Sequence, residues 1–170
     1  MSAPGPEEAI VAGRVLMVIS AGAGALEPAA RSAAAVARES GGVVRIAWMH
    51  PVPPPRVDRH DRVVADTDRE MARLTERAHE RMSALAWELG EIPVERVVRF
   101  GRLATELAVE AHAWRADLVG LAVPTRPGLG HHLRAWYLAR TVTVPLVLLP
   151  IPRHDGGDRR REPVALPAFR

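Results

Sequence analysis

Five short apolar runs recur along the chain, and each of the first four is followed by a stretch long enough for a helix. Apolar runs of this length are typical of strands buried in a parallel sheet. Right-handed crossovers between such strands leave few arrangements other than a parallel sheet with helices on both faces. We therefore expect an α/β fold with a five-stranded parallel sheet and four helices. The expected strands are residues 14–20, 43–50, 94–100, 117–122 and 144–149.

The segments between the runs carry recognisable helix signals. Residues 28–40 are rich in alanine, begin with a proline that suits a first helical turn, and are followed by two glycines. Thr67 and Glu70 have the spacing of a capping box, and apolar residues then recur at helical spacing as far as Leu89. A third helix is expected after Gly101 and a fourth should end near residue 142.

Two features refine this sheet. The run at 94–100 is the most polar of the five, so we expect it at an edge. The run at 43–50 is followed by Pro-Val-Pro-Pro-Pro, which offers too few amide donors to remain in a sheet, and then by a polar connection to about Ala65.

The composition excludes several classes of chemistry. The 170 residues contain no cysteine, and all 23 basic residues are arginine. Disulfides, thiolate nucleophiles, Schiff-base lysines and P-loop lysines are therefore absent. The net charge of +3 and the 4% aromatic content are not those of a nucleic-acid module. The sequence contains neither a run of eighteen apolar residues nor a basic leader before an apolar segment, so we expect no membrane association and a cytoplasmic location.

Catalytic and metal-binding patterns are also missing. The nucleophile elbow G-x-S-x-G does not occur. Ala21-Gly-Ala-Gly24 resembles the start of a dinucleotide fingerprint, but Glu27 stands where the third glycine is needed. His131 and His132 are adjacent, so on a helix they point about 100° apart and cannot chelate one ion well. We expect no enzyme activity and no metal site.

Three segments together resemble a universal stress protein domain of the UspA type. They are the strand at 14–20, the passage Arg99-Phe-Gly-Arg-Leu-Ala-Thr-Glu-Leu107, and the last third, where Ala116-Asp-Leu-Val-Gly-Leu121 leads through Arg126-Pro-Gly-Leu129 to Val144-Pro-Leu-Val-Leu148. The resemblance covers residues 13–150, which we interpret as one domain between flexible tails at 1–12 and 151–170. It implies a Rossmann-like sheet of order 3-2-1-4-5.

In one branch of that family, ATP binds at the topological switch point between the first and fourth strands, through the motif G-2x-G-9x-G-[S/T]. This chain departs from the motif at all four positions and has Ser20 where ATP-binding members commonly end the first strand with Asp. The motif positions are Ala122, Thr125, Ala135 and Trp136. Glycine is needed there because backbone amides must approach phosphate oxygens closely.

The loop between the motif positions has changed as well. Pro124 and Pro127 remove two amide donors, and the remaining glycines, Gly128 and Gly130, stand outside the motif. Arg126 or Arg134 could still engage a phosphate, although solvation of both is the simpler interpretation.

We expect Trp136 to fill the cleft that a nucleotide occupies elsewhere, with Tyr137 directed toward solvent or a partner. The sequence therefore predicts a regulatory or interaction module that uses no cofactor and binds an unknown protein partner. The resemblance implies a homodimer through the last strand, residues 144–149, from Val144 to Leu149. Two alternatives stay open: ATP binding through a diverged phosphate loop, and binding of an apolar small molecule in the altered cleft.

Overall fold

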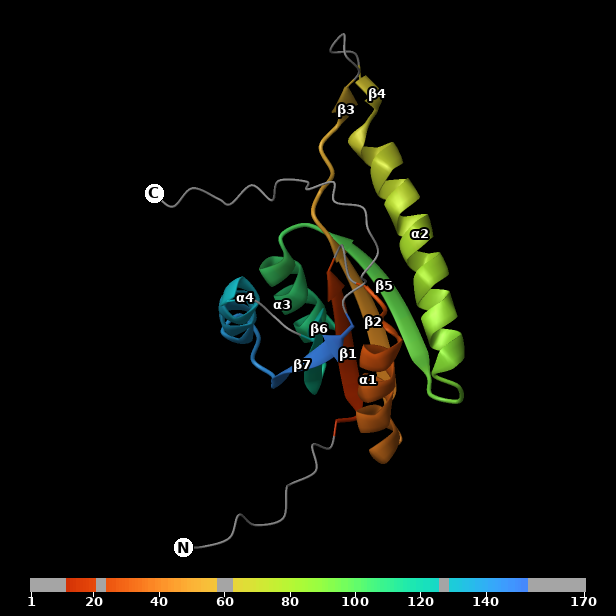
Figure 1. Cartoon of the computed structure of the whole chain (residues 1–170), viewed down its shortest axis with the longest axis vertical. Helices are drawn as coiled ribbons and strands as arrows, with labels where there is room; N and C mark the ends of the chain where they lie inside the picture. Colours follow the sequence, from red (N-terminus) through yellow and green to blue (C-terminus); the bar gives the residue numbers. More distant parts are fainter. Residues whose placement is uncertain (1–11, 21–23, 58–62, 126–128, 153–170) are drawn as a thin grey trace, which may run out of the picture.

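The structure, a computed structural model, describes residues 12–20, 24–57, 63–125 and 129–152. Its centre is a five-stranded sheet in which every neighbouring pair is parallel. The order along the sheet is β5-β2-β1-β6-β7, which is the predicted 3-2-1-4-5 arrangement (Figure 1). The strands are β1 (Arg14–Ser20), β2 (Val43–His50), β5 (Val94–Phe100), β6 (Leu118–Pro124) and β7 (Leu146–Ile151).

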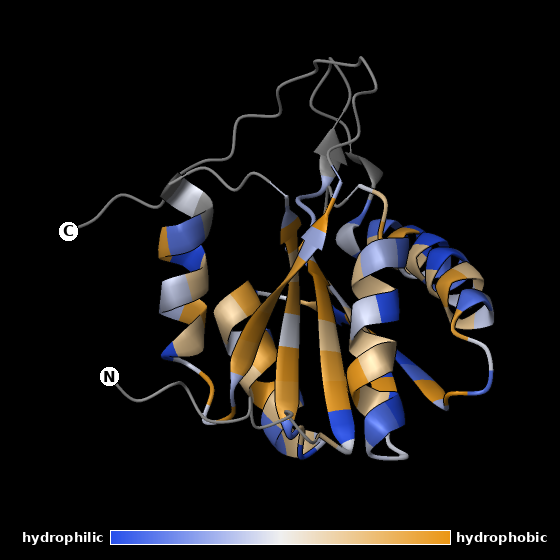
Figure 2. Cartoon of the chain, turned by 60° about the horizontal axis from the view of Figure 1, so that its bottom comes forward, coloured by the Kyte–Doolittle hydropathy of each residue, from blue (hydrophilic) through white to orange (hydrophobic). Residues whose placement is uncertain are grey.

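Four helices cover the two faces of this sheet. On one face of the sheet, α1 and α2 pack against strand side chains to form one hydrophobic core. On the other face, α3 and α4 pack against strand side chains to form a second core. Colouring by hydropathy shows the strands as the most hydrophobic part of the molecule, between helices of mixed character (Figure 2). The helices are α1 (Glu27–Glu39), α2 (Thr67–Glu88), α3 (Leu103–Ala113) and α4 (Leu129–Ala139).

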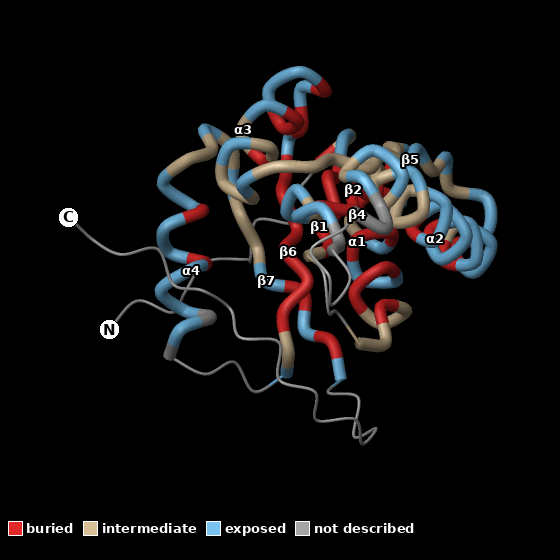
Figure 3. Tube along the Cα trace, turned by 90° about the horizontal axis from the view of Figure 1, so that it is seen from above, coloured by how far each residue is buried: buried red, intermediate tan, exposed pale blue. Residues whose placement is uncertain are grey.

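Burial follows the position of each strand in the sheet. β1 lies at the centre, and five consecutive residues of it are buried because helices cover both of its faces (Figure 3). The edge position predicted for residues 94–100 is confirmed, since β5 contains no fully buried residue. β7 forms the opposite edge and leaves Leu148 exposed.

Several boundaries differ from the expected ones for local reasons. The prediction that Thr67 caps α2 was wrong. Asp66 is the N-cap of this helix, and its carboxylate accepts a hydrogen bond from the Arg69 amide at 2.8 Å. Glu70 pairs with Arg73 instead. β7 begins two residues later than expected because Pro145 has no amide hydrogen, and its carbonyl accepts from Val119.

The polar connection after β2 contains a feature that the sequence did not predict. β3 (Arg56–Val57) and β4 (Val63–Ala65) form a short antiparallel hairpin. The hairpin projects beyond the five-stranded sheet, at the carboxyl ends of the sheet strands (Figure 1). Two-residue and three-residue strands are too short to show a periodicity in sequence. The tails predicted at 1–12 and 151–170 lie almost entirely outside the described residues.

Candidate functional site

A cleft of about 520 Å³ opens at the carboxyl ends of the strands. In sheets of this kind ligands bind at that edge, near the point where successive connections leave in opposite directions. Here that point lies between β1 and β6, because the chain passes from β1 to β2 on one side and β6 pairs with β1 on the other. The lining includes Ser20 from β1, Met49 and His50 from β2, Arg102 and Leu103 at the start of α3, and Arg134 from α4.

His50 is the titratable residue at the end of β2. Its ring stacks between the rings of Trp48 and Phe100, with centroid distances of 6.1 Å and 5.5 Å. Burial lowers the pKa of His50 below its ordinary value of 6.5. Within the described residues, its Nε2 atom is buried without a hydrogen-bond partner. Burial therefore favours the neutral form of the His50 ring, and no carboxylate among the described residues pairs with its Nε2 atom.

The start of the segment that corresponds to the family's phosphate loop belongs to β6 of the sheet, and residues 126–128 of it lie outside the described residues. β6 pairs with β7 in continuous register as far as Pro124 opposite Ile151. The next residue, Thr125, donates both its backbone amide, at 2.9 Å, and its hydroxyl, at 2.8 Å, to the carbonyl oxygen of Ile151. Ala122 is buried in the core beneath. Neither Ala122 nor Thr125 lines the cleft, and the Thr125 amide is already occupied.

The expectation that Trp136 fills the cleft was wrong. Its side chain is 61% exposed on the outer side of α4, where the guanidinium of Arg140 lies 4.8 Å from the centre of its ring. The buried side of α4 is formed by Ala135 and Leu138, which pack in the core on the α3 side of the sheet. Tyr137 is exposed, as expected.

The remaining predicted residues divide between the cleft and its surroundings. Ser20 and Arg134 line the cleft, so two residues named from the sequence do come together there. Gly130 is exposed in the first turn of α4, and a Cβ built on it would meet no other atom within 4 Å. Arg126 and Gly128 lie outside the described residues.

The sequence did not single out Arg102 and Leu103 as site residues. They follow Gly101, whose φ of +154° turns the chain from β5 into α3 at the carboxyl edge of the sheet. Arg102 is the N-cap residue of α3 and makes no capping hydrogen bond with its side chain. A glycine directly after a predicted strand was the available signal, because the residues after it must turn over the sheet edge.

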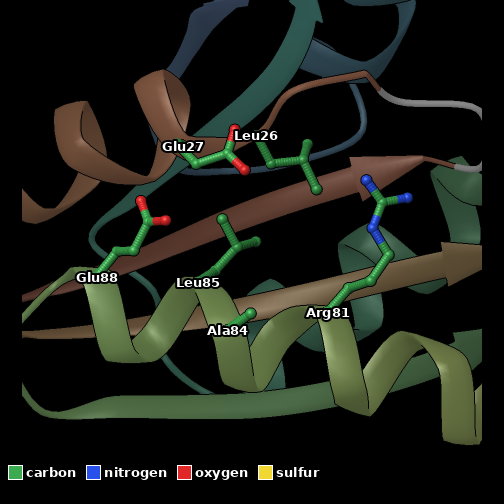
Figure 4. A pocket seen from close by; sticks show the side chains of 6 residues that line it. All are labelled: Leu26, Glu27, Arg81, Ala84, Leu85 and Glu88. Atoms are coloured by element: carbon green, nitrogen blue, oxygen red, sulfur yellow. The ribbon is translucent and has the colours of Figure 1, made fainter.

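A second pocket of about 90 Å³ lies between α1 and α2 (Figure 4). Glu27 and Glu88 extend from the two helices toward one end, and Arg81 lies at the other. The guanidinium of Arg81 covers the ring of Trp48 at 5.2 Å. No group of three metal-ligating side chains occurs within the residues that the structure describes. This pocket is too small for a nucleotide and holds no converging set of ligands.

The fold and the cleft together define a Rossmann-like α/β domain with a cleft at the carboxyl ends of β1 and β2. The family model described as "Universal stress protein family" matches residues 12–150. The chain belongs to the universal stress protein family. Among curated proteins no significant match is found.

Solved structures of the family share the fold at low sequence identity. A universal stress protein in complex with cAMP is 18% identical with a TM-score of 0.59, covering 81% of this chain and 97% of that one. A protein of the family from Burkholderia pseudomallei is 14% identical with a TM-score of 0.63, covering 87% and 100%. UspA from Lactobacillus plantarum is 13% identical with a TM-score of 0.56, covering 80% and 96%.

In the described part of the chain, no helix has both the length and the apolar character that crossing a membrane requires.

Proposed function

We propose that this chain is a regulatory module that works through protein contacts, as a homodimer, and does not bind ATP through the family's phosphate loop. The observation that carries the proposal is the environment of Trp136. At the position where the ATP-binding motif has a hydroxyl residue, this chain places an indole on its outer surface. Large aromatic side chains with arginine beside them are the composition of binding hot spots.

The neighbours of Trp136 extend this surface. Leu133, Trp136 and Tyr137 are all exposed and, being three and four positions apart, share one side of α4. Leu148 is exposed on edge strand β7. It stands two residues after Leu146, so both side chains lie on the same face of the sheet, the one that α4 covers.

Among the residues that the structure describes, nothing pairs with the outer edge of β7. A free strand edge and an exposed apolar surface both favour association with another chain. Two copies of β7 could pair antiparallel about a two-fold axis, which would bring the same surfaces together in both copies. The predicted dimer through residues 144–149 is therefore retained as a proposal, with α4 as part of the contact.

The experiment is a mass measurement by sedimentation at several protein concentrations. We expect the parent to sediment at twice the chain mass of 18.5 kDa and Trp136→Ser to shift toward the monomer. Trp87→Ser is the matched control, because Trp87 is 88% exposed on α2, on the opposite face of the sheet. A monomeric parent, or equal dissociation of both variants, would contradict the dimer.

The pairing of Thr125 with Ile151 supports the second half of the proposal, that ATP does not bind through the family's phosphate loop. Phosphate oxygens are held by free backbone amides, and here the Thr125 amide already donates to Ile151. Calorimetric titration with ATP should show no saturable binding by the parent. Ala135→Gly with Trp136→Ser restores two motif residues, and binding gained by that double variant would indicate a nucleotide site lost by substitution.

Nucleotide binding in an altered mode is the second candidate. The observation in its favour is the open cleft lined by Arg102 and Arg134, whose guanidinium groups match phosphate oxygens. One structural neighbour is a complex with cAMP. Saturable binding of ATP or cAMP by the parent, weakened at least tenfold by Arg134→Ala, would establish this candidate over the first.

A further inference from the structure

The chain leaves β2 through Pro51-Val-Pro-Pro-Pro55, and covalent geometry restricts this segment strongly. Each proline ring holds φ near −65°, and each residue before a proline is driven to an extended ψ. Val52, Pro53 and Pro54 all precede prolines, so they are confined to the polyproline II region. The structure accordingly assigns neither helix nor strand to residues 51–55.

The burial of the five residues fits the geometry of a polyproline II helix. Such a helix has three residues per turn, so residues three apart lie on the same edge. Pro51 and Pro54 are exposed on one edge, and Val52 and Pro55 are exposed on the next. Pro53, on the third edge, is half-buried. The segment therefore presents two of its three edges to solvent and turns the third toward the protein.

Both ends of the segment are attached to regular structure. Before it, the His50 carbonyl accepts a hydrogen bond from the Gly101 amide at 2.9 Å, which continues the pairing of β2 with β5. After it, the chain enters the hairpin of β3 and β4. A segment that is already extended and anchored loses little conformational entropy when it binds.

The backbone of the segment also has acceptors to offer. Four of its five residues lack an amide hydrogen, so it cannot extend a sheet. Within the described residues, no backbone amide donates to a carbonyl of residues 51–55. Grooves that recognise polyproline II segments accept prolines between aromatic rings, whose indole and phenol groups can donate hydrogen bonds to such carbonyls.

We propose that residues 51–55 are a docking peptide for a partner protein with an aromatic-lined, polyproline-II-binding groove. The edge of Pro51 and Pro54 and the edge of Val52 and Pro55 enter the groove, and Pro53 remains against the body of the protein. The inference rests on the proposed function in taking the chain to act through protein contacts. It does not require the dimer, and it places Pro51 and Val52, which also line the cleft, against the partner.

The test uses three isolated domains of known polyproline II specificity, an SH3, a WW and an EVH1 domain, each labelled with ¹⁵N and titrated with the full-length protein. Saturable shifts at the groove aromatics of at least one domain are expected. Pro51→Ala with Pro54→Ala, which alters one exposed edge and, at Pro51, the lining of the cleft, should weaken that binding at least tenfold. Pro53→Ala is the matched control and should change it less than threefold.

Two further measurements distinguish a loss of docking from a loss of folding or of dimerisation. A synthetic peptide of residues 50–56 should displace the full-length protein from the same groove, which confirms the binding segment without relying on a folded variant. Sedimentation of each variant reports whether the dimer persists, so loss of docking and loss of dimerisation are distinguishable. The proposal is overturned if all three domains stay silent at millimolar protein, or if Pro53→Ala weakens binding as much as the outward pair does.

Discussion

Replacing Glu110 with glutamine removes a fully buried negative charge from the contact between α3 and the sheet. The Glu110 side chain is 0% exposed and receives hydrogen bonds from two arginines on neighbouring strands. Arg45 of β2 donates from Nη1 at 2.5 Å, and Arg99 of β5 donates from Nε at 2.8 Å. A second nitrogen of Arg99, Nη2, lies 2.6 Å from the same carboxylate. Glutamine has nearly the same shape but keeps only one oxygen acceptor and no charge.

The expected loss of stability depends on how well water can solvate the two arginines once the carboxylate is removed. Breaking a fully buried ion pair by removing one partner costs about 3–5 kcal/mol. The side chains of Arg45 and Arg99 are 24% and 39% exposed, so each can be solvated when its partner is lost. We therefore expect Glu110→Gln to lower the free energy of unfolding by about 2 kcal/mol. For a domain of this size that corresponds to roughly 4–8 °C in the midpoint of thermal unfolding.

The matched control is Glu95→Gln. Glu95 pairs with the same Arg45, but its side chain is 47% exposed, and surface pairs contribute about 0–1 kcal/mol. Both variants and the parent are unfolded with urea at one fixed protein concentration, so that any dimer contributes equally. Equal losses for the two variants would refute the reasoning, because burial of the carboxylate would then not determine the cost.

Two further predictions concern the backbone and pH. A Cβ on Gly42 would clash with the backbone carbonyl of Gly13, so Gly42→Ala should lower the free energy of unfolding by about 1–3 kcal/mol in urea titrations. Gly130→Ala, where a Cβ would meet no other atom, should be neutral or slightly stabilising. Because burial lowers the pKa of His50, the unfolded chain binds its proton more tightly than the folded one. The free energy of unfolding should fall as pH drops below about 6.5, and comparison of unfolding at pH 7.5 and 5.5 should show a smaller decrease in His50→Phe. A slope unchanged by His50→Phe would assign the pH dependence to other groups.

The architecture was largely predictable because its signals are local. Apolar runs separated by helical segments are sufficient for a parallel α/β sheet, and the polar run at β5 correctly indicated an edge. The departures from the glycine motif could also be located in sequence. The hairpin of β3 and β4 could not, because its strands are shorter than any periodicity.

The orientation of α4 was decided by tertiary packing. Residues 133 and 136 form one apolar stripe and residues 135 and 138 another, so the sequence of this helix is compatible with burying either side. The smaller pair, Ala135 and Leu138, is buried. Trp136 was therefore predicted in the cleft and is found on the surface.

The sequence by itself determined the sheet, its helices and the loss of the phosphate-binding glycines, because each depends on residue types at fixed local spacing. Only the tertiary structure decided that the Thr125 amide is occupied by Ile151, that the described residues form a cleft at the carboxyl ends of the strands, and that two edges of the proline segment face solvent. Each of these depends on which distant segments lie side by side, and local spacing carries no information about that.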